Sequence, residues 1–206
     1  MITRKSLAEQ VIRLVSGFKP TQDRNIDLRE VMIAVDQARD AAVVKWMYQN
    51  LQIEGQGYVA ADFLNVYTDT PKYDASRKRH YLKLKYNVFS LPNDIGVYHV
   101  SLLEDEANPF IPMRNGYMSL FNGMASKSNL NNISFFVENQ KIWLDGDLDS
   151  DWASTILIKM VAVSGTVPDD DEYVIPNGLA SEIIRQVAQL YGVRTPADNK
   201  NDDISL

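Results

Sequence analysis

Hydrophobic and polar positions recur with a helical period near the beginning of the chain. Over residues 3–16 the apolar residues Leu7, Val11, Leu14 and Val15 fall on one helical face, with polar residues between them. Gly17 follows, as is typical of a helix end. This pattern predicts a short amphipathic helix capped by Thr3 or by Ser6, because both are good capping residues and Glu9 follows Ser6 at capping-box spacing.

Two further helices are predicted. Residues 27–51 keep the 3.6-residue period with Leu28, Val31, Met32, Val35, Ala38 and Ala42, and Asp27 with Glu30 has the spacing of a capping box. A last helix is expected to take Asn177 as its N-cap and to end at Gly192. Its apolar stripe consists of Leu179, Ile183, Val187 and Leu190. We expect the last helix and the long helix to pack against each other.

The residues between these helices have a different pattern. Short apolar or aromatic runs, separated by Pro, Gly, Asn and Asp, predict β-strands. The predicted strands cover residues 63–67, 81–86, 97–102, 117–121, 134–137, 141–144 and 155–163. Glu138-Asn139-Gln140 is predicted to connect two of them as a hairpin, and the strand at 155–163 is apolar enough to lie centrally in a sheet.

Helices, then strands, then a helix, without alternation of strand and helix, predict an α+β fold. We expect an N-terminal helical hairpin and a C-terminal helix to form a helical part, with a central antiparallel β-rich subdomain. The expected divisions are a helical segment at 1–53, the β-rich subdomain at 58–164, and an acidic loop with the last helix at 165–192, packing on the helical part. Residues 193–206 are polar and largely aperiodic, which predicts a flexible tail.

Composition and charge exclude several classes of site and partner. The 206 residues include no cysteine, so disulfides, thiolate zinc sites and cysteine nucleophiles are excluded. No apolar run reaches the roughly 18 residues of a membrane span, and no signal peptide is recognisable, so we expect no membrane partner and synthesis in a cytoplasm. A net charge of −6 argues against wrapping nucleic acid, although DNA could still slide past the surface.

Catalytic motifs are scarce. The two histidines, His80 and His99, lie in strand-like runs, and we interpret both as ordinary structural or surface residues. The sequence has no nucleophile elbow, no H-E-x-x-H pair and no phosphate-binding loop. We therefore expect a protein that is not an enzyme and that holds no cofactor.

One acidic stretch has metal-like spacing. Asp145, Asp147, Asp149 and Asp151 alternate as the ligands at the start of an EF-hand loop do. The remainder of that motif is missing, because Ser150 replaces the required glycine and Ile156 replaces the bidentate glutamate. A solvated acidic loop between strands is the favoured interpretation, and a Ca²⁺ site is the alternative. The acidic residues at 169–172 are likewise interpreted as an exposed loop.

A basic cluster consists of Arg77, Lys78 and Arg79, with Tyr73 and Tyr81 close by in the sequence. Basic side chains interleaved with aromatic ones can hold a nucleic-acid backbone. They can also pair with acidic residues of a neighbouring subunit, or lie on a solvated strand edge. The solvated edge is the favoured interpretation.

Two apolar segments are candidates for a subunit or partner interface. In the first, prolines three positions apart fix an extended segment that cannot join a central ladder, and its apolar side chains need cover from the protein's own core or from a partner. In the second, apolar residues run nearly all round the late part of the long helix, so that oligomer packing would enclose it. The candidates are Trp46, Tyr48, Pro109, Phe110, Ile111, Pro112 and Met113.

Several local segments carry a resemblance to a known family. They are LPNDIGVYHV at 91–100, NPFIP at 108–112, GYMS at 116–119, IP at 175–176, TRK at 3–5 and DR at 23–24. Together, across about residues 3–191, they resemble the tail or connector ring proteins of crAss-like bacteriophages, which are short-tailed phages of Bacteroidota. The size and the helix-plus-β layout are also similar to the adaptor rings beneath the portal of other short-tailed phages.

The resemblance implies a virion structural protein that forms a homo-oligomeric ring of twelve copies at the portal vertex, after synthesis in the host bacterial cytoplasm. The implied partners are the portal protein, the adjacent tail ring or tail tube proteins, and viral DNA that passes through the lumen without sequence-specific binding. A net acidic subunit suits a channel that must not hold DNA tightly. The alternative function is a soluble carbohydrate- or peptide-binding β module with a Ca²⁺-binding acidic loop.

Overall fold

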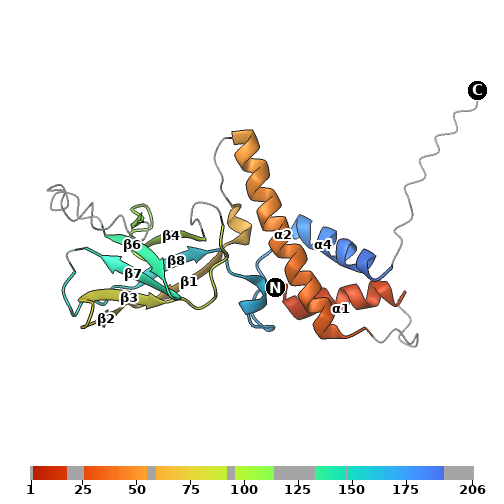
Figure 1. The fold of residues 1–206 in the computed structure, drawn as a ribbon, viewed down its shortest axis with the longest axis horizontal. Helices are drawn as coiled ribbons and strands as arrows, with labels where there is room; N and C mark the ends of the chain where they lie inside the picture. The colour runs from red at the N-terminus through yellow and green to blue at the C-terminus, as the bar shows by residue number, and fades with distance from the viewer. Residues whose placement is uncertain are drawn as a thin grey trace, which may run out of the picture. The chain divides into compact units, whose positions relative to one another are not determined.

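The computed structural model describes residues 2–17, 26–54, 59–91, 96–113, 133–146 and 148–192. The chain divides into two compact units (Figure 1). The helical unit combines Met1–Tyr58 with Pro168–Leu206, and the β unit is Val59–Val167. The predicted α+β class is confirmed. The predicted strand at 117–121 and the predicted tail at 193–206 lie outside the described residues.

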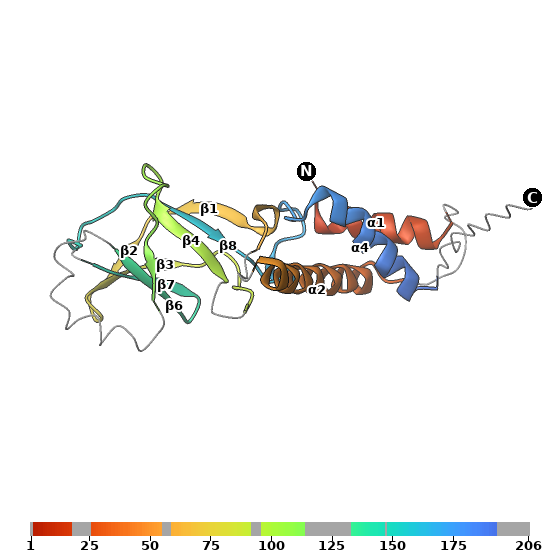
Figure 2. The same ribbon diagram turned by 90° about the horizontal axis from the view of Figure 1, so that it is seen from above.

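The helical unit contains α1 (Arg4–Val15), α2 (Leu28–Glu54) and α4 (Asn177–Leu190), which lie side by side (Figures 1 and 2). Thr3 caps α1 in a capping box with Ser6, since each side-chain oxygen accepts the other residue's backbone N–H at 3.1 Å. Gly17, at φ +60°, ends this helix. None of the helices in the described ranges is long and apolar enough to cross a membrane.

The starts of α2 and α4 are formed differently. Before α2, the Asp27 carboxylate accepts the Arg29 backbone N–H at 2.9 Å, as expected of a capping residue. At α4 the predicted N-cap is wrong by one residue. Pro176 is the N-cap, and its carbonyl oxygen accepts the backbone N–H groups of Leu179 and Ala180, so Asn177 is already helical.

The core of the helical unit is formed by all three helices. The expected packing of α2 against α4 is confirmed, and α1 contacts both. The buried side chains that meet there include Leu7, Val11, Val31, Val35, Ile183 and Val187. Burying a side chain of this size contributes about 1.5–3 kcal/mol relative to leaving it exposed, so the apolar stripes account for the bundle.

A polar network, largely buried except at Asp169, ties α1 and α2 to the segment before α4. Arg4 Nη2 lies 2.5 Å from Asp36 Oδ2, and Arg4 Nη1 lies 3.0 Å from Asp169 Oδ1. The Tyr173 hydroxyl donates to Asp36 Oδ1 at 3.0 Å. Burial raises the pKa of the Asp36 carboxyl above its usual value, while Arg4 and Tyr173 act in the opposite direction. We call these residues the Arg4–Asp36–Tyr173 network.

The β unit contains two sheets in the described part of the chain. One is antiparallel with the order β1-β8-β4, from β1 (Asn65–Asp69), β8 (Ile156–Met160) and β4 (Val97–Leu102). The other has the order β2-β3-β7-β6-β5, from β2 (Lys72–Asp74), β3 (Arg79–Lys83), β7 (Lys141–Asp145), β6 (Ser134–Glu138) and β5 (Ile111–Pro112). Its pairs are antiparallel except β5, which runs parallel to β6. The predicted central position of β8 is confirmed.

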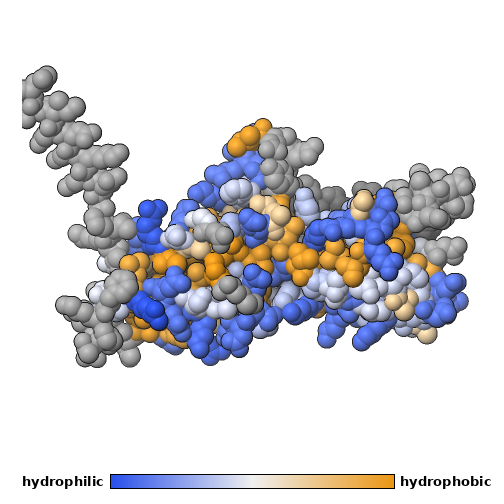
Figure 3. All heavy atoms as spheres, turned by 180° about the vertical axis from the view of Figure 1, so that it is seen from behind, coloured by the Kyte–Doolittle hydropathy of each residue, from blue (hydrophilic) through white to orange (hydrophobic). Residues whose placement is uncertain are grey.

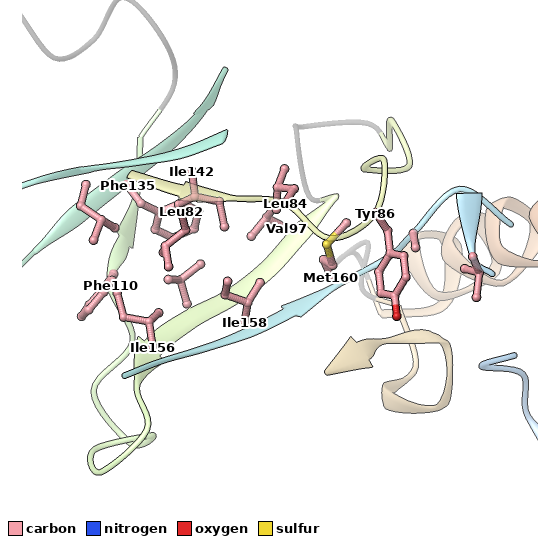
Figure 4. Packing of buried hydrophobic residues seen from close by; sticks show 14 residues of the cluster. Leu82, Leu84, Tyr86, Val97, Phe110, Phe135, Ile142, Ile156, Ile158 and Met160 are labelled. Atoms are coloured by element: carbon pink, nitrogen blue, oxygen red, sulfur yellow. The ribbon is translucent and has the colours of Figure 1, made fainter. Parts of the chain in front are cut away.

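The two sheets enclose the core of the β unit. Leu82, Phe135 and Ile142 of the larger sheet point toward Ile156 and Ile158 of the smaller one (Figure 4). Each of these side chains is at most 4% exposed. Face-to-face packing of this kind explains why one set of alternate positions in each strand is apolar.

Local geometry confirms one predicted connection and corrects the bounds of three strands. The predicted strand at 81–86 is β3 at Arg79–Lys83, and the one at 155–163 is β8 at Ile156–Met160. Asn139 and Gln140 have φ of 50° and 60°, the left-handed conformation of a two-residue hairpin turn between β6 and β7. The predicted strand at 63–67 begins later, because Ala61–Phe63 forms a 3₁₀ turn and β1 starts at Asn65. Phe63 is fully buried at the end of that turn.

Candidate functional site

The helical unit carries a groove between α2 and α4 with a volume of about 360 Å³. Helix α2 contributes Ala38, Ala41, Ala42 and Trp46 to its lining, and α4 contributes Leu179 and Ile183. The other half of the lining is polar or charged and consists of Lys45, Gln49, Glu182, Arg185, Gln186 and Gln189. Short alanine side chains leave room for another helix to approach closely, while Trp46 and the aliphatic residues offer apolar contact. This mixed lining suits an amphipathic partner helix, with its apolar side on Trp46 and the alanines and its polar side on the charged residues.

Large apolar side chains are exposed on the helical unit, both in the groove and outside it. Trp46 is 41% exposed and Tyr48 is 49% exposed, so both predicted interface candidates are accessible, while Ile53 reaches 81% and Leu190 73%. Hydrophobic residues, in orange, interrupt the hydrophilic surface in the view from behind (Figure 3). Exposed apolar side chains of this size are available for contact with a partner. That a partner covers Trp46 and Tyr48 stays a prediction.

The predicted basic cluster lies at the hairpin between β2 and β3. Lys78 occupies the turn at φ 51° and is exposed. Arg77 Nη1 lies 2.6 Å from Glu138 Oε2, and Arg79 Nε lies 3.6 Å from Asp145 Oδ1. Both arginines are therefore paired with acidic residues of their own chain.

These basic residues belong to a wider surface on the larger sheet. The strand register puts Tyr81 opposite Trp143, and Trp143 opposite Phe136, on the face that points away from the core. The Arg77 guanidinium lies 4.5 Å from the centre of the Trp143 ring, and Lys141 Nζ lies 4.2 Å from that of Tyr81. Each such cation–π contact contributes about 0.5–1 kcal/mol at an exposed site. The cationic sheet face is defined as Lys72, Arg77, Lys78, Arg79, Lys83 and Lys141.

The candidate segment at 108–113 is divided between core and surface. Phe110 is 6% exposed and belongs to the core of the β unit, so its assignment as an interface candidate is corrected. Its backbone N–H donates to Val100 O at 2.7 Å, which holds the side chain inward. Ile111 and Pro112 form the edge strand β5 and are exposed, as is Pro109, while Met113 packs against the rings of Phe136 and Trp143.

The acidic candidates do not converge in the described residues. Asp145 ends β7 and pairs with Arg79, whereas Asp149 and Asp151 are exposed beyond the strand. Asp147 lies outside the described residues. Within the described ranges, no three His, Asp or Glu side chains are grouped so that they could hold a metal ion.

The two histidines have different surroundings. His80 is 2% exposed, and its ring contacts those of Tyr73 and Trp152 at centroid distances of 5.1 and 5.7 Å. His99 Nε2 lies 3.1 Å from Ser101 Oγ, but Ser101 is fully buried and inaccessible to a substrate. Burial lowers the pKa of His99, and Lys159 adds to this effect.

Sequence reasoning missed the groove and the extent of the cationic sheet face. The groove is formed by helices more than 100 residues apart in the sequence, and the only available signal was the alanine spacing within α2. The cationic sheet face depends on strand register, which places Lys141 beside Tyr81 and Trp143. No protein-family model and no curated protein matches the chain, so these comparisons assign it to no family.

Proposed function

We propose that this protein is a virion structural protein of a short-tailed bacteriophage. It forms a homo-oligomeric ring, with twelve copies, in the portal and tail assembly, where it links the capsid portal to the tail and encloses the DNA channel. The observation that carries the proposal is the groove between α2 and α4 together with the exposed apolar side chains of these two helices. The sequence resemblance to crAss-like ring proteins indicates the assembly, a ring at the portal vertex, in which this surface would contact a partner.

Ring formation suits the chemistry of this surface. A closed ring requires contact between two different surfaces of each subunit. The apolar residues of α2 and α4 supply one such surface, because covering Trp46, Ile53 and Leu190 removes apolar area from water. The proposed neighbours are the portal protein on one side and tail ring or tail tube proteins on the other.

The net charge is compatible with a DNA channel. At −6 per copy, a ring of twelve offers little net counter-charge to DNA phosphates. DNA would therefore pass through the lumen without sequence-specific binding. Making such a ring requires no catalysis, in keeping with a purely structural subunit.

Cryo-electron microscopy of the purified virion tests the proposal. The expected result is that the fold of this chain fits a density layer with cyclic symmetry at the portal vertex, with α2 and α4 against another chain. Mass spectrometry of the same particles should detect the protein in many copies. Absence of the chain from purified particles would refute the proposal.

A pair of substitutions tests the groove itself. Ala41→Arg places a long charged side chain in the groove at an exposed position, so the bundle should still fold. We expect particles made with this variant to lack the protein or to fail in joining capsid and tail. The matched control is Ser181→Arg, which adds the same side chain at an exposed α4 position that does not line the groove, and should assemble normally. Normal assembly of the Ala41→Arg protein would exclude the groove as the contact.

A further inference from the structure

The cationic sheet face has the opposite charge to the rest of the chain. Among the residues that the structure describes, it holds six of the chain's 21 basic side chains and three of the 27 acidic ones, Asp74, Glu138 and Asp145. Its net charge is therefore +3, which leaves −9 for all other residues. Every copy thus carries a cationic surface and an excess of acidic residues elsewhere. The cationic surface of one copy is complementary in charge to the acidic residues of another copy.

Three of the six cations on this face lie over aromatic rings. Arg77 lies over Trp143, Arg79 lies 5.9 Å from the centre of the Phe136 ring, and Lys141 lies over both Tyr81 and Trp143. Side chains that are already ordered lose less freedom when they bind. These three cations form an ordered base for the face, and Lys72, Lys78 and Lys83 add exposed positive charge around it.

The burial of the rings indicates the class of partner. Trp143 is 3% exposed and Phe136 is 5% exposed, so neither ring is open to stack on a nucleobase. The exposed groups are charges, above all Lys72, Lys78 and Lys83. This arrangement favours an acidic protein surface over single-stranded nucleic acid.

We infer that the cationic sheet face binds the acidic segment at residues 169–172 of a second copy of this chain. The segment holds four consecutive acidic residues, among which Asp170 and Glu172 are exposed and Asp169 is held by Arg4. The contact joins two different surfaces, so repeating it produces a ring or an open chain of subunits. The inference rests on the proposed function in one respect, because it names a contact between copies that closes the proposed ring.

Zero-length cross-linking with mixed isotopes tests this contact directly. Full-length protein labelled with ¹⁵N is mixed with unlabelled protein at high concentration and low salt, and treated with a carbodiimide. The reagent joins a lysine amine to a carboxylate as an amide with loss of water. We expect mixed-isotope peptides that join Lys72, Lys78 or Lys83 to the segment at 169–172. Only same-isotope links, links between other segments, or a chain that remains monomeric would overturn the inference.

Charge reversal supplies a second test with a matched rescue. Lys72→Glu with Lys78→Glu and Lys83→Glu should weaken association about thirtyfold, since three lysines that attract the acidic segment become glutamates that repel it. Adding Asp170→Lys and Glu172→Lys to the same chain restores opposite charges and should recover most of the loss. The control Lys5→Glu with Arg13→Glu and Arg29→Glu makes the same change in net charge at exposed positions of the helical unit. Equal weakening by the control, or no rescue, would overturn the specific contact.

Two further outcomes separate this inference from the proposed function. If a fluorescent duplex oligonucleotide binds the wild-type chain and not the triple-glutamate variant, without links between copies, the face binds nucleic acid and the inference is wrong. If the virion contains the ring but the cationic sheet face meets no neighbouring copy, the inference fails while the proposed function stands. If the cross-link forms and the virion lacks the chain, only the proposed function fails.

Discussion

Replacing Tyr173 by phenylalanine tests whether the Arg4–Asp36–Tyr173 network stabilises the helical unit. The substitution removes only the hydroxyl group, which donates to Asp36 Oδ1 at 3.0 Å from a side chain that is 2% exposed. Phenylalanine keeps the ring, so no large cavity forms. The Asp36 carboxylate loses one hydrogen-bond donor at a site that water does not easily reach.

The expected loss follows from the charge of the acceptor. Hydrogen bonds to charged groups contribute about 1.5–3 kcal/mol, so Tyr173→Phe should lower the unfolding free energy of the helical unit by that amount. In an Asp36→Asn background the acceptor is neutral, and the same substitution should cost only about 0.5–1.5 kcal/mol. The difference between the two costs measures the coupling between the two side chains.

Amide hydrogen exchange is the appropriate assay, because the two units need not unfold together. Tyr173→Phe should accelerate exchange in α1, α2 and α4 and leave exchange in β8 unchanged. Tyr48→Phe, at an exposed position of α2, is the control and should change stability by less than about 0.5 kcal/mol. An effect of Tyr173→Phe as small as that of the control, or one shared equally by β8, would refute the reasoning.

Three further substitutions give distinct expected outcomes. Ile158→Ala empties a fully buried position on the central strand β8 and should destabilise the β unit by about 2–5 kcal/mol in urea denaturation, while Val66→Ala, at a 57% exposed position of β1, should have little effect. Gln140 has φ 60°, a conformation that glycine adopts without strain, so Gln140→Gly should raise the unfolding free energy of the β unit by about 0.5 kcal/mol in thermal denaturation. A decrease would contradict the assignment of the turn. The pKa of His99 is lowered from 6.5, so the folded state favours the neutral imidazole. The folded state therefore has its full stability above pH 6.5 and loses part of it as the pH falls through the folded-state pKa of His99. Thermal denaturation of wild type and His99→Gln between pH 5 and pH 8 should therefore show a smaller loss on acidification in the variant, and parallel curves would exclude this role.

The elements with strong periodicity could be predicted from the sequence. The short apolar and aromatic run at 97–102 predicted the bounds of β4, and the apolar run that contains β8 indicated its central position. The Asn139-Gln140 connection was recognisable because a short polar link between two strand-like runs indicates a hairpin. In these cases the local pattern and the final fold favour the same conformation.

Features that depend on contacts distant in sequence could not be predicted in this way. Strand β2 has little apolar content and forms by pairing with β3. Phe110 turns inward because its backbone bonds to Val100, although the prolines beside it are exposed. The sequence identified Trp46 as an interface candidate, but the groove beside it exists only once α4 lies against α2.

The division of the helical unit has a consequence for synthesis. Its first two helices precede the β unit, and α4 follows it, so about 120 residues separate α2 from the helix that covers its apolar side. On the ribosome, the β unit can complete its own core from a continuous stretch of chain. The apolar side chains of α1 and α2 that pack against α4 stay exposed until α4 emerges from the ribosome. If the ribosome stalls within the β unit, α1 and α2 would therefore be exposed to chaperones and proteases, because α4 has not yet been made.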